Sequence, residues 1–141
     1  MPEITSILED LLTRTGASRV TLRRDLPGEY AFPVTDEALA QGVSSLRDER
    51  TVDLRTQPVV LELRRCGQVV QNDSRAAYDD PAYQRMLETY GGLAAQIVTP
   101  VVVGGRLAAI VSLHQLGRAR RWTAEEIAAC RDAAARIAEL L

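Results

Sequence analysis

Two apolar runs joined by a pair of glycines place the strongest constraint on the fold. The runs are AAQIVTPVVV, residues 94–103, and RLAAIVSLHQ, residues 106–115. Gly104 and Gly105 allow the backbone of a two-residue turn, so the pattern predicts a β-hairpin. Few side chains in either run are polar, which indicates central strands. Pro100 lacks a backbone N–H, so we expect a bulge or a gap in the ladder there.

Apolar side chains recur every three or four residues in three other segments, as is typical of helices that pack on one side. These segments are residues 4–12, 80–90 and 123–141. Pro58 and Gly67 predict the start and end of a further short helix over residues 59–65. Asp80 precedes a proline and is expected to cap the third helix. Thr123 and Glu126 have the spacing of a capping box and predict the start of the last helix.

Alternating apolar and polar residues predict a second hairpin, with strands over residues 17–25 and 29–35 and a turn at Pro27–Gly28. The side chains that share one face of its second strand would be Tyr30, Phe32 and Val34.

Residues 36–56 suit a helix or a strand. Gly42 disfavours the helix, so we expect a strand from Leu39 to Leu46 and then a polar loop over residues 47–56. Residues 68–73 predict a short strand. The order of these elements predicts one α+β domain over residues 1–141, an antiparallel sheet with helices grouped on its face.

The composition disfavours several function classes. All 17 basic residues are arginine, and the net charge is −2. We therefore expect neither nucleic acid nor a membrane as a partner. The absence of lysine excludes Schiff-base chemistry and a P-loop lysine. One histidine and two cysteines are too few for structural zinc within one chain. Without a basic leader or an apolar run near ~20 residues, we expect a cytoplasmic location.

Most of the chain resembles a GAF domain, and the resemblance is clearest from Cys66 to Leu141. The similarity rests on GQVVQND at 67–73, on the hairpin that ends in His114, and on RARRWTAEEI at 118–127. It implies a central antiparallel sheet with the N- and C-terminal helices on one face and a ligand pocket under a helix and loop roof on the other. The family binds small molecules, including cyclic nucleotides, bilins and haem, and commonly dimerises through its terminal helices.

Three departures narrow the ligands that the resemblance allows. The segment DDPAYQRML, residues 79–87, has no Cys or His, so covalent bilin attachment is not expected. A chain without lysine does not match the N-K-F-D-E pattern of cyclic-nucleotide-binding members. Cys66 and Cys130 do not match the arrangement of the methionine-sulfoxide-reductase members. The ligand stays unknown.

Alternation along the last strand sorts its side chains between two faces. The more apolar set suits the terminal helices and comprises Leu107, Ala109, Val111 and Leu113. The other set would face the pocket and comprises Ala108, Ile110, Ser112 and His114. The main alternative is a surface or structural His114. A catalytic role is not expected, because no nucleophile or orienting carboxylate lies near it in sequence.

The resemblance adds five residues to the candidate ligand site. Gln96 and Val98 would form the matching pocket set on the preceding strand. Tyr83 and Tyr78 lie in the roof segment, and Asp73 follows the short strand. The alternatives are ordinary half-buried tyrosines and an aspartate that caps its own turn.

The corner before the last helix has two interpretations. Arg118, Arg120 and Arg121 could hold an anion at the helix start. We favour a structural corner in which Trp122 packs on the core and one arginine pairs with an acid. Cys66, after two arginines, could be a reactive thiol, although a plain cysteine is the simpler interpretation.

These observations predict a non-catalytic sensory module that binds a small molecule and acts as a homodimer on a separate partner protein. One alternative is a dimerisation scaffold without a ligand, which a cavity below the ~300 Å³ usual for ligand sites would favour. A thiol-based reductase is the other.

Overall fold

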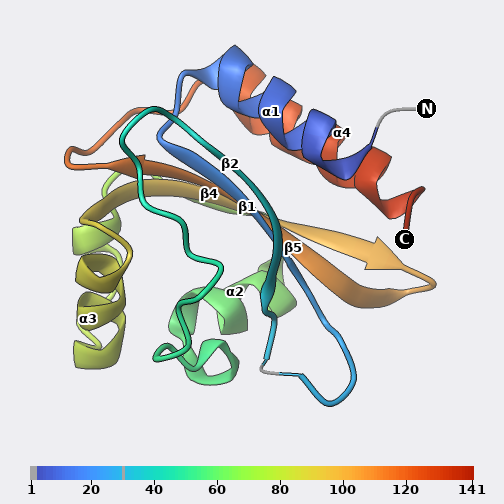
Figure 1. Ribbon diagram of the computed structural model, residues 1–141. Coiled ribbons are helices and arrows are strands. Elements are labelled where there is room, and N and C mark those ends of the chain that lie inside the picture. The colour runs from blue at the N-terminus through green and yellow to red at the C-terminus, as the bar shows by residue number, and fades with distance from the viewer. Residues whose placement is uncertain (1–2, 30) are drawn as a thin grey trace.

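The computed structural model describes residues 3–29 and 31–141 and has a five-stranded antiparallel sheet in the order β2-β1-β5-β4-β3 (Figure 1). The elements in chain order are α1 (Ile4–Thr15), β1 (Arg19–Arg24), β2 (Val34–Leu39), η1 (Leu54–Thr56), α2 (Pro58–Cys66), β3 (Val69–Gln71), η2 (Ser74–Ala76), α3 (Pro81–Thr89), β4 (Leu93–Val103), β5 (Arg106–Leu116) and α4 (Ala124–Ala138). The α+β class predicted from the sequence is confirmed. No helix in the described part of the chain is long and apolar enough to span a membrane.

The glycine pair makes the predicted hairpin. Gly104 and Gly105 have φ values of 58° and 78°, the left-handed region that a tight hairpin turn requires. β4 and β5 pair along their whole length and form the centre of the sheet. Pro100 keeps its partner Ile110, and the register shifts one residue later, between Val101 and Val102. The expected irregularity therefore lies beside the proline and not at it.

This bulge corrects the predicted faces of β5 at one end. Val101 pairs with Ala109 and Val102 pairs with Leu107, so Ala108 is the extra residue. An extra residue reverses the alternation beyond it. Leu107, expected under the terminal helices, instead packs against the core on the opposite face.

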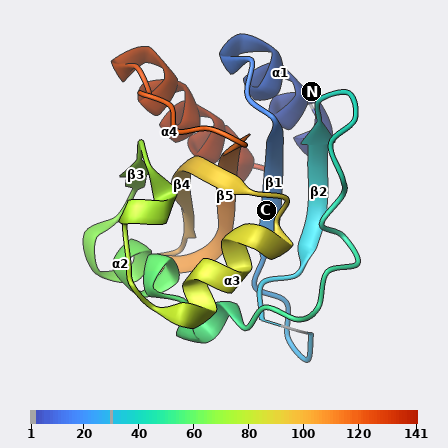
Figure 2. The same cartoon turned by 90° about the vertical axis from the view of Figure 1, so that its left-hand side faces the viewer.

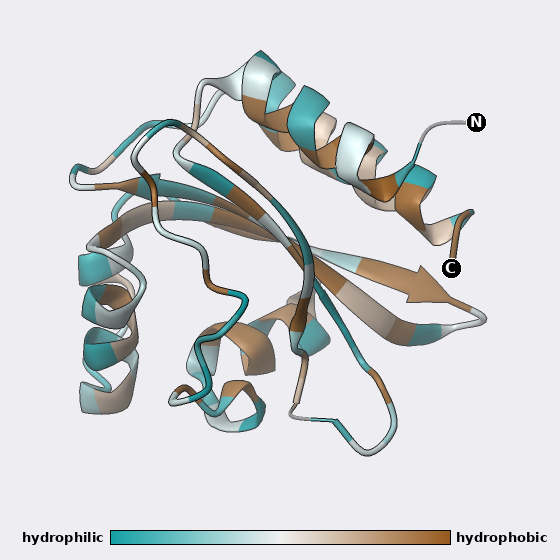
Figure 3. Cartoon of the chain, in the orientation of Figure 1, coloured by the Kyte–Doolittle hydropathy of each residue, from teal (hydrophilic) through white to brown (hydrophobic). Residues whose placement is uncertain are grey.

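α1 and α4 lie side by side on one face of the sheet, as predicted (Figures 1 and 2). Hydrophilic and hydrophobic residues alternate along the ribbons of both helices, as in amphipathic helices (Figure 3). Leu8 and Leu11 of α1 and Cys130 and Ile137 of α4 are buried there against residues of β1, β4 and β5. Each fully buried leucine stabilises the fold by about 1.5–3 kcal/mol, so this layer anchors the sheet.

α2, α3 and the 40–57 segment cover the other face of the sheet (Figure 2). A second apolar cluster forms between them and the strands, and it includes Val59, Leu63, Met86, Leu87 and Ile110. The sheet thus separates two cores, one under α1 and α4 and one under α2 and α3.

The prediction for residues 29–46 was wrong in its boundaries. β2 begins at Val34, and Phe32 lies before it with a φ of 54°; Tyr30 lies outside the described residues. The predicted strand from Leu39 to Leu46 does not form, because the chain turns at Gly42, whose φ is 82°. β2 is an edge strand with polar residues in its middle, so it lacks the alternation on which the prediction relied.

The corner before α4 is structural. The Trp122 indole N–H donates to the Gln71 carbonyl at 2.9 Å, and the Arg120 guanidinium lies 4.5 Å from the centre of the Trp122 ring. Arg120 also pairs with Glu126, as the favoured interpretation required. Thr123 and Glu126 form both hydrogen bonds of the capping box.

Candidate functional site

A small cavity lies between the sheet and the α2–α3 layer. Its volume is about 30 Å³, room for about one water molecule. One wall is polar and consists of Arg23, Tyr90, Gln96, Ser112 and His114. The remaining wall is apolar and consists of Leu54, Val59, Val60, Met86, Val98 and Ile110.

His114 is buried in the polar wall, and its hydrogen bond fixes its tautomer. The Arg19 Nε–H donates to His114 Nδ1 at 3.1 Å. Nδ1 must therefore be the unprotonated nitrogen, and the neutral ring carries its proton on Nε2. Burial, together with the positive charges of Arg19 and Arg23, holds the pKa of His114 well below its ordinary value. The imidazole is thus a neutral donor at physiological pH.

Two buried arginines give this end of the cavity a positive charge. Arg19 donates to the carbonyl oxygens of Ser44 and Tyr90 at 3.1 and 2.7 Å, and its desolvation lowers its pKa to about 10. Arg23 donates to the Phe32 carbonyl and the Tyr90 hydroxyl at 3.1 and 3.0 Å.

Neither guanidinium makes an ion pair among the described residues. Glu37 acts on Arg19 only through space, without contact. A buried cation without a counter-ion is costly, so a negatively charged or acceptor-rich group in the cavity would be stabilised.

A chain of polar side chains continues behind the cavity. The Tyr83 hydroxyl contacts the Ser74 carbonyl at 2.8 Å and Gln71 Oε1 at 3.0 Å, and Gln96 Nε2 donates to the same Gln71 oxygen at 3.0 Å. Within the described residues, Gln71 Nε2 is buried and has no hydrogen-bond partner. This chain orients Gln96 toward the cavity.

The structure brings four of the seven candidate site residues together at the cavity: Gln96, Val98, Ser112 and His114. The other three lie outside its wall. Tyr83 is completely buried behind Gln71, and the hydroxyl of half-buried Tyr78 donates to Glu62. Asp73 is exposed where η2 begins, and its side chain makes no capping hydrogen bond.

Arg23 and Tyr90 line the cavity but were not among the predicted site residues, although the sequence carries a usable signal for Arg23. β1 alternates Arg19, Thr21 and Arg23 with Val20 and Leu22. If the apolar pair faces the terminal helices, the arginines must face the pocket side. A strand with this alternation usually has one face in solvent, so its arginines would be expected there. In β1 both faces are covered, so the arginines are buried.

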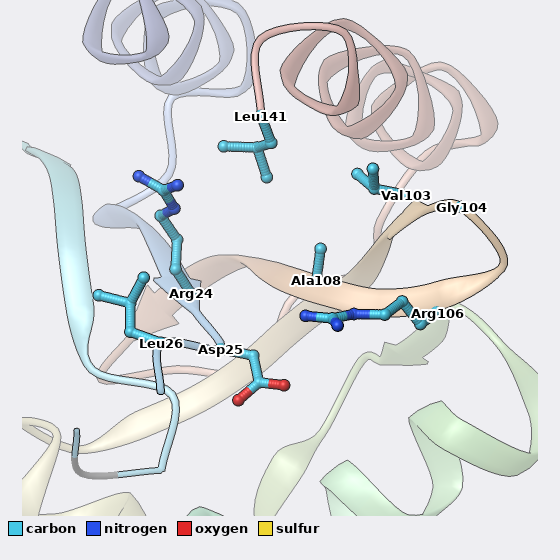
Figure 4. A pocket seen from close by; sticks show the side chains of 8 residues that line it. All are labelled: Arg24, Asp25, Leu26, Val103, Gly104, Arg106, Ala108 and Leu141. Atoms are coloured by element: carbon cyan, nitrogen blue, oxygen red, sulfur yellow. The ribbon is translucent and has the colours of Figure 1, made fainter. Parts of the chain in front are cut away.

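The larger hollows lie at the surface. One of about 360 Å³ lies between the tip of the β4–β5 hairpin and Leu141 (Figure 4). The side chains of its arginines, Arg24 and Arg106, make no ion pair within the described part of the chain. Asp25 also lines it, with its carboxylate directed away from Leu141 (Figure 4). The charged side chains of this surface hollow do not converge on one point, whereas the polar side chains of the buried cavity do.

Neither cysteine lines the cavity. Cys66 is exposed at the end of α2, and Cys130 is a buried residue of α4. Burial raises the pKa of the Cys130 thiol to about 12, so this thiol is not a nucleophile at neutral pH. A thiol-based reductase would need a cysteine at the cavity, and none of the residues that line the cavity is a cysteine.

Comparison with known proteins gives one family and one fold. A family model described as "GAF domain" matches residues 4–141. No curated protein matches the chain.

Similar solved structures include GAF3 from Slr1393 of Synechocystis sp. PCC6803, which is 21% identical with a TM-score of 0.77 over 96% of this chain and 88% of that one. The GAF domain of PixJ from Thermosynechococcus elongatus, in its blue-light absorbing form, is 22% identical with a TM-score of 0.75 over 97% and 83%.

The chromophore-binding domain of phytochrome P1 from Stigmatella aurantiaca is 15% identical with a TM-score of 0.77. The match covers 98% of this chain and 52% of that one. At these identities the likeness shows the fold alone.

Proposed function

Because this chain belongs to the GAF domain family, we propose that it is a non-catalytic sensory module that binds a small molecule beneath its sheet. The observation that carries the proposal is the convergence of Arg23, Gln96, Ser112 and His114 on one buried cavity. Ligand sites are mostly apolar pockets with a few convergent polar groups, which is the composition of this wall. The similar structures include a chromophore-binding domain, so the fold accommodates a ligand.

Ligand binding would require the cavity to expand. A volume of about 30 Å³ is too small for a metabolite, so a ligand would enter only if part of the wall moved outward. The sheet is fixed from behind by α1 and α4, whereas the roof consists of short helices and the 40–57 segment. The roof is therefore the part that moves, and its movement is the signal that a separate partner protein would read.

The homodimer is also part of the proposal. Ala128 and Ala135 are exposed on the outer side of α4 and would allow a second copy to approach closely. None of the large exposed hydrophobic residues in the described part of the chain lies on α1 or α4, so we expect a weak dimer.

Native mass spectrometry and thermal shift test the ligand directly. Protein purified without denaturation should retain a small molecule, or a metabolite panel should raise the melting temperature. At a hundredfold excess over Kd, a ligand stabilises by about 2.7 kcal/mol, or roughly 5–10 °C for a domain of this size.

Substitutions of two neighbouring arginines test whether the ligand that raises the melting temperature binds in the cavity. Arg23→Met should abolish the ligand-induced shift. Arg24→Met should preserve it, because Arg24 lines the surface hollow near Leu141 and not the cavity. Equal shifts in both variants would place the ligand elsewhere, and no shift with any metabolite would remove the sensory proposal.

A second candidate function follows from the small volume of the cavity. A pocket filled by its own side chains favours a scaffold that dimerises without a ligand. This candidate predicts no retained molecule and no thermal shift, together with a stable dimer. The same two measurements therefore separate the two functions.

A further inference from the structure

A surface groove runs between the 51–57 segment and α3, and its volume is about 340 Å³. Thr51, Gln57, Ala82 and Thr89 are among the residues that line it. Its volume lies in the range of small-molecule sites, unlike that of the buried cavity.

Met86 is the only residue in the described part of the chain that lines both the groove and the cavity. Its side chain is 3% exposed and separates the two spaces. Methionine is unbranched and has several accessible rotamers, so it can move aside at a smaller cost than a branched residue. A change of its rotamer would join the groove to the cavity.

Gln57 supplies a second and independent observation. It lines the groove and is 4% exposed, and its Oε1 is buried without a hydrogen-bond partner among the described residues. An unpaired buried acceptor is destabilising unless something donates to it. A hydroxyl or amine group on a ligand in the groove would donate to this oxygen, whereas the carboxylate of the ligand would not.

We propose that the groove is the entrance to the buried cavity, that Met86 is its gate, and that the inner end selects small carboxylic acids. The selectivity comes from Arg23, which makes no ion pair in the described part of the chain and interacts with Glu49 only through space, and from the Nε2–H donor of His114. Among the described residues, no acid lines the cavity to oppose an anion. This inference rests on the proposed function and adds the route and the ligand class.

Cysteine accessibility tests the route without any knowledge of the ligand. Ser112→Cys places a thiol in the cavity wall, in a Cys66→Ser background that removes the exposed native thiol. The probes are the anionic 2-sulfonatoethyl and the cationic 2-(trimethylammonium)ethyl methanethiosulfonates. The thiolate displaces methanesulfinate from either probe and forms a mixed disulfide, which mass spectrometry quantifies. Cys66→Ser alone gives the background from Cys130.

Met86→Ala should increase the labelling rate of the thiol introduced by Ser112→Cys at least tenfold. Leu87→Ala is the matched control, because Leu87 is an equally buried neighbour on α3 that lines neither space. Ala82→Trp should fill the groove and slow labelling at least fivefold. Glu88→Trp, on the same helix but outside the groove, should not.

The charge of the probe tests the ligand class. The anionic probe should label the introduced thiol at least tenfold faster than the cationic probe after each rate is normalised to that of a free thiol. Equal rates, or a faster cationic probe, would overturn the carboxylate preference.

The same measurements can reject the route. The groove is not the entrance if Met86→Ala raises the labelling rate no more than Leu87→Ala does. It is also not the entrance if labelling is as fast in Ala82→Trp as in Glu88→Trp. The proposed function fails separately, through the absence of any thermal shift or retained molecule, because the labelling requires no ligand.

Discussion

His114 shows how a single residue depends on its neighbours. Its ring is buried, accepts a hydrogen bond from a guanidinium and lies nearly parallel to Tyr90, with ring centres 6.0 Å apart. A protonated ring could not accept the bond from Arg19 and would add a third buried cation beside Arg19 and Arg23. The folded state therefore requires the neutral form.

This requirement predicts a pH dependence of stability. An unfolded histidine has a pKa near ~6.5, and the pKa of folded His114 lies well below that value. As the pH falls below about 6.5, the unfolded chain gains a proton that the folded chain does not, so stability falls, by at most about 1.4 kcal/mol per pH unit. The loss stops growing below the folded pKa.

Urea unfolding between pH 7.5 and 5 measures this effect. His114→Gln keeps an acceptor for Arg19 but does not titrate, so its stability should fall less steeply than that of the wild type. Parallel curves for the two proteins would show that His114 is not held neutral.

Tyr83 and Tyr78 form a matched pair for the polar chain behind the cavity. Tyr83→Phe removes a hydroxyl that contacts Ser74 and Gln71 in a fully buried place, and should cost about 1–2 kcal/mol of unfolding free energy. Tyr78→Phe removes a partly exposed contact with Glu62 and should cost less than about 1 kcal/mol. Chemical denaturation gives both values, and a larger loss in Tyr78→Phe would contradict this ranking.

The face on which a single residue lies could be predicted from the sequence where the two-residue alternation of a strand decided it. The alternation of β5 placed Ser112 and His114 correctly on the face opposite α1 and α4. Arg23 was missed because an arginine in a strand usually points to solvent, and only the tertiary structure buries this one.

At the scale of elements, local signals defined the helices and the central hairpin well. Asp80 accepts from the backbone N–H groups of Ala82 and Tyr83, and the glycine turn has the backbone that it needs. The 29–46 region failed because an edge strand and an irregular loop are specified by long-range contacts. The bulge at Ala108 had no local signal except the nearby Pro100.

The capping box gives a prediction at this scale. Thr123→Ala removes the acceptor for the Glu126 N–H and should cost about 1 kcal/mol, or roughly 3 °C in melting temperature. Thr123→Ser keeps the hydroxyl and should lose less than half of that. Thermal unfolding of both variants is the check, and an equal loss would mean that the methyl group and not the cap is responsible.

At the scale of the whole molecule, the two faces of the sheet have different roles. The face under α1 and α4 is a continuous apolar core, whereas the other face buries arginines, glutamines and a histidine among apolar residues. Polar groups in a core reduce stability unless they are fully satisfied. Their concentration on one face is consistent with a ligand site there.

The dimer is tested on the whole molecule. Sedimentation equilibrium over a wide concentration range should show a reversible monomer–dimer equilibrium. Ala128→Arg together with Ala135→Arg should shift it fully to monomer, because two charges on each copy would then repel across the α4 face. A wild type that stays monomeric at every concentration would reject the dimer.

The most direct measurement uses the fact that His114 is the only histidine. Protein without a histidine tag and labelled with ¹⁵N at histidine gives one imidazole spectrum. We expect a neutral Nε2–H tautomer that does not titrate near pH 6.5, and signals that shift when a ligand that raises the melting temperature is added. An imidazole that titrates normally, or that such a ligand leaves unchanged, would contradict a ligand site on this face of the sheet.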